Sequence, residues 1–317
     1  MYRTFVVPLD GSPLAERALT TATALAKRSG AKLALVRVHN PYPLDPLAGT
    51  LEAPTDVRWD QMLRRDEEEY LNRVALRVET ELGRVVATSL LDGLAPDAIA
   101  AFAERAPQAL IVMSTHGRSG FTRLWLGSVT DSVVRHAGVP VLMVRGEEGA
   151  GAAAPSAGEL FHDIVVPLDG SPYAEEALAH ALALAGATRG RLLLLSVVRP
   201  MHAPVYVPVP DALAPVATPT EFIEQTMQVL VARAEDYVSR LADRLRREHA
   251  PLDVRAEVQV ADQPASAIID CAARHGSDLV VMASHGRALS RVVVGSVADK
   301  VLRGGPGALL LIRPAQA

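Results

Sequence analysis

An identical run of eight residues occurs twice in this chain and constrains the fold more than any other feature. Residues 6–13 and residues 165–172 both read Val-Val-Pro-Leu-Asp-Gly-Ser-Pro. Such an identity, half a chain apart, indicates that two copies of one domain are joined in tandem. The length of 317 residues agrees with two domains of ordinary size.

The composition favours helices packed on buried parallel sheets. Hydrophobic residues make up 49% of the chain but aromatic residues only 4%, so Ala, Val, Leu and Ile must build the cores. The formal net charge of −4 provides no general positive field for nucleic acid or an anionic membrane. We therefore expect neither of these as a partner.

The N-terminal residues lack the shape of a signal peptide, and no apolar run reaches the roughly 18–20 residues of a membrane span. These features favour a cytoplasmic protein. The single cysteine, Cys271, excludes an intramolecular disulfide. It lies in a helix-like stretch, and we interpret it as a small apolar packing residue.

Strand and helix patterns alternate in the same order in both copies, with a small-residue linker predicted at 147–159. The copies then span 1–146 and 160–317. This alternation predicts an α/β fold in which each copy forms a five-stranded, doubly wound, Rossmann-like parallel sheet. The expected strands lie near 4–9, 32–38, 85–91, 110–114 and 139–144, and near 164–168, 191–197, 253–260, 279–283 and 309–312.

Two segments in each copy are expected beyond the carboxyl ends of strands, where open α/β sheets bind ligands. One is the Asp-Gly-Ser run at residues 10–12 and 169–171, and the other ends in Gly-Ser-Val at residues 127–129 and 295–297. Glycines let backbone N–H groups approach an anion, and a helix that starts at Gly-Ser directs free N–H groups and its dipole toward it. Alternatively, the glycines only turn the chain and the serine only caps the helix.

The other polar residues of these segments also have two readings. Asp10 and Asp169 either hold a ribose or phosphate-bound Mg²⁺, or cap a turn. His116 and His285 match across the copies, but no second His or Cys stands near them at ligand spacing. We therefore expect a hydrogen bond within the loop from these histidines, no metal ligands and no catalytic residue.

The repeated Pro-Leu-Asp-Gly-Ser opening and the Ser/Thr-His-Gly-Arg…Gly-Ser-Val segment resemble the universal stress protein family in its tandem, two-domain form. The resemblance covers nearly all of both copies. It implies a fold related to adenine-nucleotide alpha-hydrolases and an ATP ligand, with or without Mg²⁺. In the family, the opening Asp and the end of strand two hold adenosine, while the glycine loop and the following Ser wrap the phosphates. The candidate cofactor-binding residues are therefore Asp10, Val38, Ser114, His116, Gly117, Gly127, Ser128 and Val129, and in the second copy Asp169, Val197, Ala283, Gly286, Gly295, Ser296 and Val297.

The chain departs from the family pattern Gly-x2-Gly-x9-Gly-Ser/Thr at two points. Ser114 and Ala283 replace its first glycine, and the interval from Gly286 to Gly295 is eight residues instead of nine. A missing residue redirects the N–H groups of a loop. We therefore expect the first copy to hold the better site and the second copy to be weak or degenerate.

Three functions remain open on the sequence alone. The first is an ATP-binding regulatory protein with slow hydrolysis at most, because no Gly-x4-Gly-Lys-Ser/Thr loop and no nucleophile elbow is present. The second is a nucleotide-free scaffold, and the third a hydrolase acting at the α-phosphate. Family members pair through their last strand, so residues 139–144 and 309–312 are expected to form an intramolecular pseudo-dimer, with a homodimer of whole chains left open.

Overall fold

Each copy folds into the predicted alternation of strands and helices. The computed structural model describes residues 2–39, 57–115, 127–145, 160–202, 220–284, 294–305 and 307–313. The first copy contains β1 (Thr4–Pro8), α1 (Pro13–Ser29), β2 (Lys32–His39), α2 (Val57–Leu82), β3 (Ala87–Asp92), α3 (Ala95–Arg105), β4 (Ala109–Thr115), α4 (Ser128–His136) and β5 (Val141–Arg145). The second contains β6 (Asp163–Pro167), α5 (Pro172–Thr188), β7 (Arg191–Val198), α6 (Thr220–Glu248), β8 (Val254–Val260), α7 (Pro264–Arg274), β9 (Leu279–Ala283), α8 (Ser296–Gly304) and β10 (Ala308–Ile312).

The repeated octapeptide starts the same helix in both copies. Ser12 adopts extended backbone and its hydroxyl accepts the N–H of Ala15, with proline at the first helical position. Ser171 caps α5 through Ala174 in the same way. A capping serine followed by proline satisfies one orphan N–H and sets φ for the first turn.

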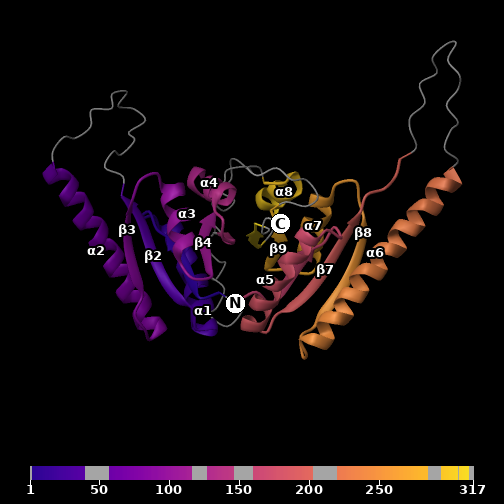
Figure 1. The fold of residues 1–317 in the computed structure, drawn as a ribbon, viewed down its shortest axis with the longest axis horizontal. Coiled ribbons are helices and arrows are strands. Elements are labelled where there is room, and N and C mark those ends of the chain that lie inside the picture. The colour runs from indigo at the N-terminus through magenta and orange to yellow at the C-terminus, as the bar shows by residue number, and fades with distance from the viewer. Residues whose placement is uncertain are drawn as a thin grey trace, which may run out of the picture.

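All ten strands form one sheet in the order β3-β2-β1-β4-β5-β10-β9-β6-β7-β8. Pairing is parallel inside each copy and antiparallel where β5 meets β10, with Leu142 opposite Leu310. The two halves therefore face each other across a pseudo-two-fold axis, with α2 and α6 at opposite ends (Figure 1). The predicted pairing through the last strands is confirmed.

Helices cover both faces of the sheet, and mainly aliphatic residues fill the two layers between them. The core on one face receives α1, α2, α5 and α6, and that on the other face α3, α4, α7 and α8. Both cores run through the two copies. Cys271 is fully buried in the second of them, as expected for a packing residue.

Polar contacts join the copies on either side of the β5–β10 pair. The Tyr2 hydroxyl lies 2.6 Å from His180 Nδ1, between the N-terminal segment and α5. Arg145 at the end of β5 donates to the Leu302 carbonyl in α8, and Arg313 after β10 donates to the Arg135 carbonyl in α4. These reciprocal contacts cap the last turn of each helix with a cation from the other copy.

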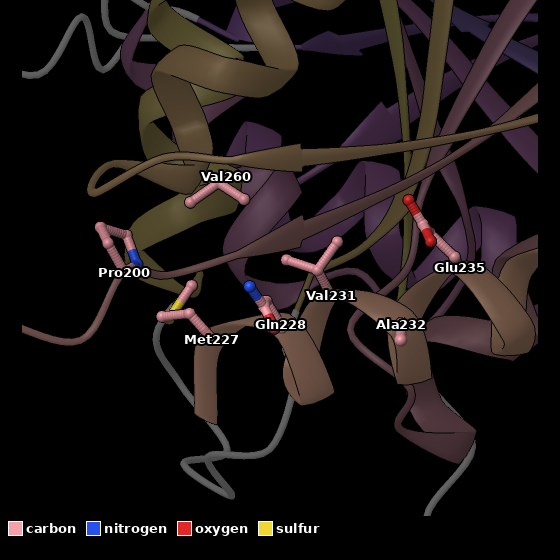
Figure 2. A pocket seen from close by; sticks show the side chains of 7 residues that line it. All are labelled: Pro200, Met227, Gln228, Val231, Ala232, Glu235 and Val260. Atoms are coloured by element: carbon pink, nitrogen blue, oxygen red, sulfur yellow. The ribbon is translucent and has the colours of Figure 1, made fainter. Parts of the chain in front are cut away.

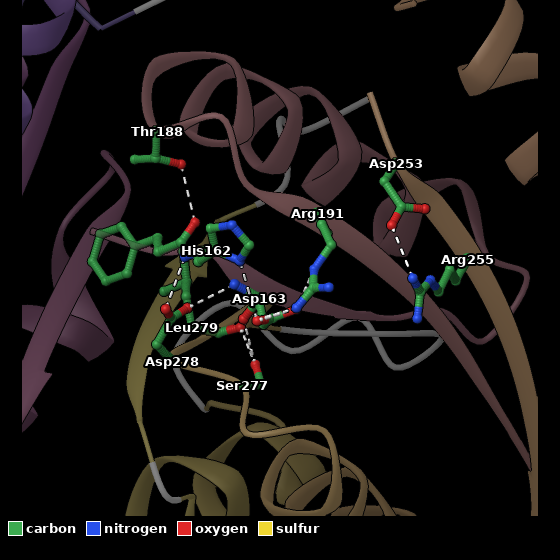
Figure 3. A network of polar contacts seen from close by, with 10 residues as sticks. His162, Asp163, Thr188, Arg191, Asp253, Arg255, Ser277, Asp278 and Leu279 are labelled. Atoms are coloured by element: carbon green, nitrogen blue, oxygen red, sulfur yellow. Dashed lines mark hydrogen bonds and ion pairs between the residues drawn. The ribbon is translucent and has the colours of Figure 1, made fainter. Parts of the chain in front are cut away.

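A further network lies at the amino ends of β6, β7 and β9. Arg191 donates twice to the Asp163 carboxylate, each at 2.8 Å, and Asp278 accepts the backbone N–H groups of His162 and Asp163 (Figure 3). Burial raises the pKa of Asp278. This network stands at the edge of the sheet opposite to the carboxyl ends, so it fastens the start of the second copy and is not part of the candidate site.

Among the described helices, none is both long and apolar enough to cross a membrane. The predicted linker, residues 147–159, lies outside the described part of the chain.

Candidate functional site

Each copy has its topological switch point between two neighbouring central strands. In the first copy β1 lies between β2 and β4, so the chain runs outward from β1 to β3 on one side and from β4 to β5 on the other. The equivalent pair in the second copy is β6 and β9. Ligands of open α/β sheets bind in the crevice beyond the carboxyl ends of such a pair, which is where the predicted motifs lie.

The aspartate after the first strand shapes a tight turn in both copies. Asp10 Oδ1 accepts the backbone N–H of Ser12 at 2.8 Å. Asp169 Oδ1 accepts the N–H of Ser171 at 3.0 Å and its hydroxyl at 2.6 Å. The turn-capping alternative is therefore present in both copies, and both aspartates remain exposed at the sheet edge.

A positive charge that the sequence did not predict, that of Arg37 in β2, lies beside the Asp10 turn. The Arg37 guanidinium lies against Gly11, since a Cβ on Gly11 would be 2.8 Å from Arg37 Nη1. It also lies 5.2 Å from the ring centroid of Tyr70 and pairs with Glu67 at 3.2 Å. Gly11 has φ of 90°, which also favours glycine. The available signal was an arginine within the apolar middle of β2, between Val36 and Val38.

A buried histidine extends this charged group beside the end of β2. His39 is 2% exposed, and its Nδ1 and Nε2 lie 2.6 Å from Glu67 and 2.8 Å from Asp60. Arg64 joins Asp60 to Asp92 at the end of β3. Burial alone lowers the pKa of His39, but the hydrogen bonds to Glu67 and Asp60 outweigh it and raise the pKa. His39, Arg37 and Arg64 thus each contact at least one carboxylate.

The second copy replaces this charged group with an apolar groove. Tyr70 and Tyr237 are equivalent, because each donates to the first-turn glutamate of the preceding helix at 2.9 Å. Strand pairing and these tyrosines place Val198 where the first copy has His39, and Met227 where it has Asp60. A groove of about 500 Å³ lies there (Figure 2), lined by Pro200, Met227, Gln228, Val231, Ala232, Glu235 and Val260. No predicted site residue lines this groove.

The residues that replace the first glycine of the pattern lie at the ends of β4 and β9. Ser114 is half-buried, and its hydroxyl donates to the Leu14 carbonyl in α1 at 2.6 Å. This bond ties the end of β4 to the helix that follows the Asp10 turn. Ala283 is buried and has no such group.

Helix α4 and helix α8 both begin one residue after a glycine. Gly127 and Gly295 are the N-cap residues, with no side-chain cap, and Ser128 and Ser296 are the first helical residues. The capping role considered for Ser128 is therefore wrong, because the preceding residue occupies the cap position. The Ser128 side chain is exposed. The first N–H groups of a helix lack intrahelical partners and attract anions.

The remaining predicted positions divide into two sets. Val38 and Val197 are half-buried near the ends of β2 and β7, and Val129 and Val297 lie in the first turns of α4 and α8. His116, Gly117 and Gly286 lie outside the described residues, as does His285.

Strand β8 and helix α7 bring together Glu257, Cys271 and His275, which the sequence reasoning did not connect. The spacing from Cys271 to His275, one helical turn, was the available signal.

The fold and the switch-point motifs together define a tandem α/β protein of two doubly wound copies with one potential ligand crevice in each. The sequence model of the universal stress protein family matches residues 1–145 and again residues 160–313. The chain belongs to the universal stress protein family.

Relatives and solved structures agree with this assignment. A universal stress protein of Mycolicibacterium smegmatis is 27% identical over 98% of this chain and 96% of its own length. One of Methanocaldococcus jannaschii is 32% identical over 46% of this chain and 83% of its own length. The crystal structure of a universal stress protein from Archaeoglobus fulgidus shares the fold with a TM-score of 0.67, at 18% identity, and covers 99% of this chain and 100% of that one.

Proposed function

We propose that this chain is an ATP-binding regulatory protein whose first copy holds the nucleotide at the carboxyl ends of β1, β2 and β4. Asp10 and Val38 would contact adenosine, and Gly117, Gly127, Ser128 and Val129 the phosphates, with Ser114 and His116 beside them. No side chain is assigned to catalysis, so hydrolysis would be slow at most. Mg²⁺ would accompany the phosphates.

The observation that carries this proposal is the start of α4 beside the β1–β4 switch point. Gly127 caps the helix without a side chain, which leaves room for an anion at the N–H groups of its first turn. Ser114, at the first glycine position, donates to the Leu14 carbonyl in α1 at 2.6 Å, so its hydroxyl has a partner within the protein.

The two copies would differ in their affinity for the nucleotide. The second copy would use Asp169, Val197, Ala283, Gly286, Gly295, Ser296 and Val297. It lacks Arg37, because strand register places Ser196 there, and its loop is one residue shorter. We propose that it binds nucleotide weakly or serves only as the structural partner of the first.

A proline at the first helical position provides a sharp test. Ser128→Pro removes one N–H and the hydroxyl from the proposed phosphate site, while proline is well tolerated at that position. Gly127 has ψ of 142°, which suits the residue before a proline. We expect calorimetric titration with Mg-ATP to show at least about tenfold weaker binding, without loss of thermal stability in the free protein.

Ser296→Pro is the matched control in the second copy, where Gly295 has ψ of 149°, and it should leave ATP affinity nearly unchanged. Chromatography of nucleotide extracted from the purified chain identifies the base and phosphate number, with Gly117 and Gly286 replaced in turn. If no nucleotide co-purifies and millimolar Mg-ATP leaves the melting temperature unchanged, the nucleotide-free scaffold is correct. If only Ser296→Pro weakens binding, the site lies in the second copy.

A further inference from the structure

Three metal-ligating side chains converge on the outer part of the second copy. Cys271 lies on the last turn of α7, His275 is its C-cap residue, and Glu257 lies on β8. Their donor atoms all lie within 4.8 Å of one another. We name these three residues the Glu–Cys–His cluster.

The three side chains of the cluster differ in their exposure to solvent. Cys271 is fully buried, Glu257 is partly buried and His275 is 40% exposed. An ion among them would be reached from solvent past His275. Solvent could also supply a further ligand.

The local hydrogen bonds orient the carboxylate toward the other two donors. Gln259 and Arg274 both donate to Glu257 Oε1, at 2.7 and 3.0 Å. The second oxygen, Oε2, lies 2.8 Å from His275 Nε2. The guanidinium charge is therefore held on one carboxylate oxygen, and the other faces the imidazole.

The fold does not require this chemistry at these positions. Strand pairing places Ser89 of the first copy where the second has Glu257. The equal lengths of α3 and α7 place Phe102 at the position of Cys271 and Ala106 at that of His275. The same layer is thus built in the first copy without any ligating group.

A reactive thiol is the weaker explanation of the cluster. Burial, and then the nearby Glu257 charge, raise the pKa of Cys271 to about 11. A neutral, buried thiol is a poor nucleophile. Coordination to a cation is the chemistry that uses all three groups together.

We propose that the Glu–Cys–His cluster binds one Zn²⁺ ion through Cys271 Sγ, His275 Nε2 and Glu257 Oε2, with water as the fourth ligand. Sulfur, imidazole and carboxylate are the ligand types that zinc prefers, in tetrahedral geometry. Bonds of about 2.0–2.3 Å place tetrahedral ligands about 3.3–3.8 Å apart, so side-chain movements of about 1 Å close the site. One thiolate and one carboxylate balance the charge of the ion.

Cobalt substitution tests this proposal directly, because Cys271 is the one cysteine of the chain. Tag-free, chelator-treated protein is titrated with Co²⁺ and then with Zn²⁺. We expect a thiolate-to-cobalt charge-transfer band and tetrahedral visible bands that saturate at one ion per chain and disappear as Zn²⁺ displaces Co²⁺. Zn²⁺ should also raise the melting temperature.

Substitution of each proposed ligand assigns its role. His275→Ala and Glu257→Ser, which install the residues of the first copy, should each weaken binding by at least about 100-fold. Cys271→Ser, which exchanges only the sulfur for oxygen, should abolish the charge-transfer band. His249→Ala, which removes an exposed histidine at the end of α6, should leave affinity within twofold. Absence of a charge-transfer band at saturating Co²⁺, or equal Zn²⁺ affinity of His275→Ala and His249→Ala, overturns the proposal.

Discussion

His39 is a fully enclosed histidine that faces a carboxylate at each ring nitrogen. Its partners, Glu67 and Asp60, come from α2, so the imidazole joins the end of β2 to that helix. The second copy has Val198 in the same register and packs without the charge. The position therefore tolerates an aliphatic side chain, and what the histidine adds is its pair of contacts with the Glu67 and Asp60 carboxylates.

His39→Val is expected to lower stability in a pH-dependent way. A pKa raised in the folded state stabilises most below the unfolded value of about 6.5, and this stabilisation is lost as pH rises through the folded pKa. The variant should lose about 2 kcal/mol of unfolding free energy at pH 6, because it removes hydrogen bonds to charged groups, and the loss should shrink toward pH 9. Urea unfolding of both proteins across this range measures the difference. A loss that stays constant with pH would contradict a charged His39.

At the scale of single elements, α1 and α5 begin after a capping serine, whereas α4 and α8 begin after a glycine. The first pair relies on a serine hydroxyl that accepts an N–H of the first turn. The second pair begins after glycine and leaves its first N–H groups without a side-chain cap. The absence of a side-chain cap, which α3 and α7 share, leaves the first N–H groups of α4 and α8 without an acceptor from the N-cap residue.

Ser12→Ala and Ser171→Ala should each cost about 1 kcal/mol, because each removes an N-cap acceptor. Chemical denaturation of the two variants measures this loss. Ser266→Ala replaces an exposed serine within α7 and should be neutral or slightly stabilising. Similar values for all three variants would show that the hydroxyl bonds at Ser12 and Ser171 contribute nothing.

The two copies meet along a seam formed by the β5–β10 pair and by helices α4 and α8, and a single copy would expose its half of this seam. Besides the β5–β10 pair, α4 and α8 carry a ring of charges in which Arg135 lies 3.6 Å from Asp299 and Arg303 lies 3.7 Å from Asp131. These groups are partly exposed, so each contact contributes at most about 1 kcal/mol. The pairing of β5 with β10 contributes the larger part of the free energy that holds the copies together. Without it, each copy would expose an apolar edge strand.

Residues 1–146 expressed alone should therefore form a dimer through β5. The universal stress protein of Methanocaldococcus jannaschii matches 46% of this chain over 83% of its own length, so most of that relative corresponds to one copy. Arg135→Asp in this fragment would place only acidic groups in the ring and should weaken the dimer about tenfold. Analytical ultracentrifugation measures both. A monomeric wild-type fragment at micromolar concentrations would contradict the seam as the source of association.

Local patterns predicted most of the fold correctly. The duplicated octapeptide marked the two copies, and the alternating apolar runs located the ten strands that the described residues form. Small errors occurred at element ends: Val85, expected in a strand, lies before β3 and is 85% exposed. The Ser128 cap was also misplaced by one residue.

The contacts that could not be predicted join residues that lie far apart in the sequence. His39 meets residues 21 and 28 positions away, and Glu257 meets His275 across 18 positions. Nothing periodic distinguishes these residues from other charged positions on helices and strands. Their partners follow only from the strand register and the rotation of each helix about its axis.

The sequence by itself determined the duplication, the α/β alternation, the family resemblance and the motifs at the strand ends, because each depends on residues close together in the chain. Only the tertiary structure decided that Arg37 lies against the Asp10 turn, that the copies differ there in charge, and that Glu257, Cys271 and His275 meet. Those outcomes depend on how separate elements pack, and packing sets distances that local patterns leave undefined.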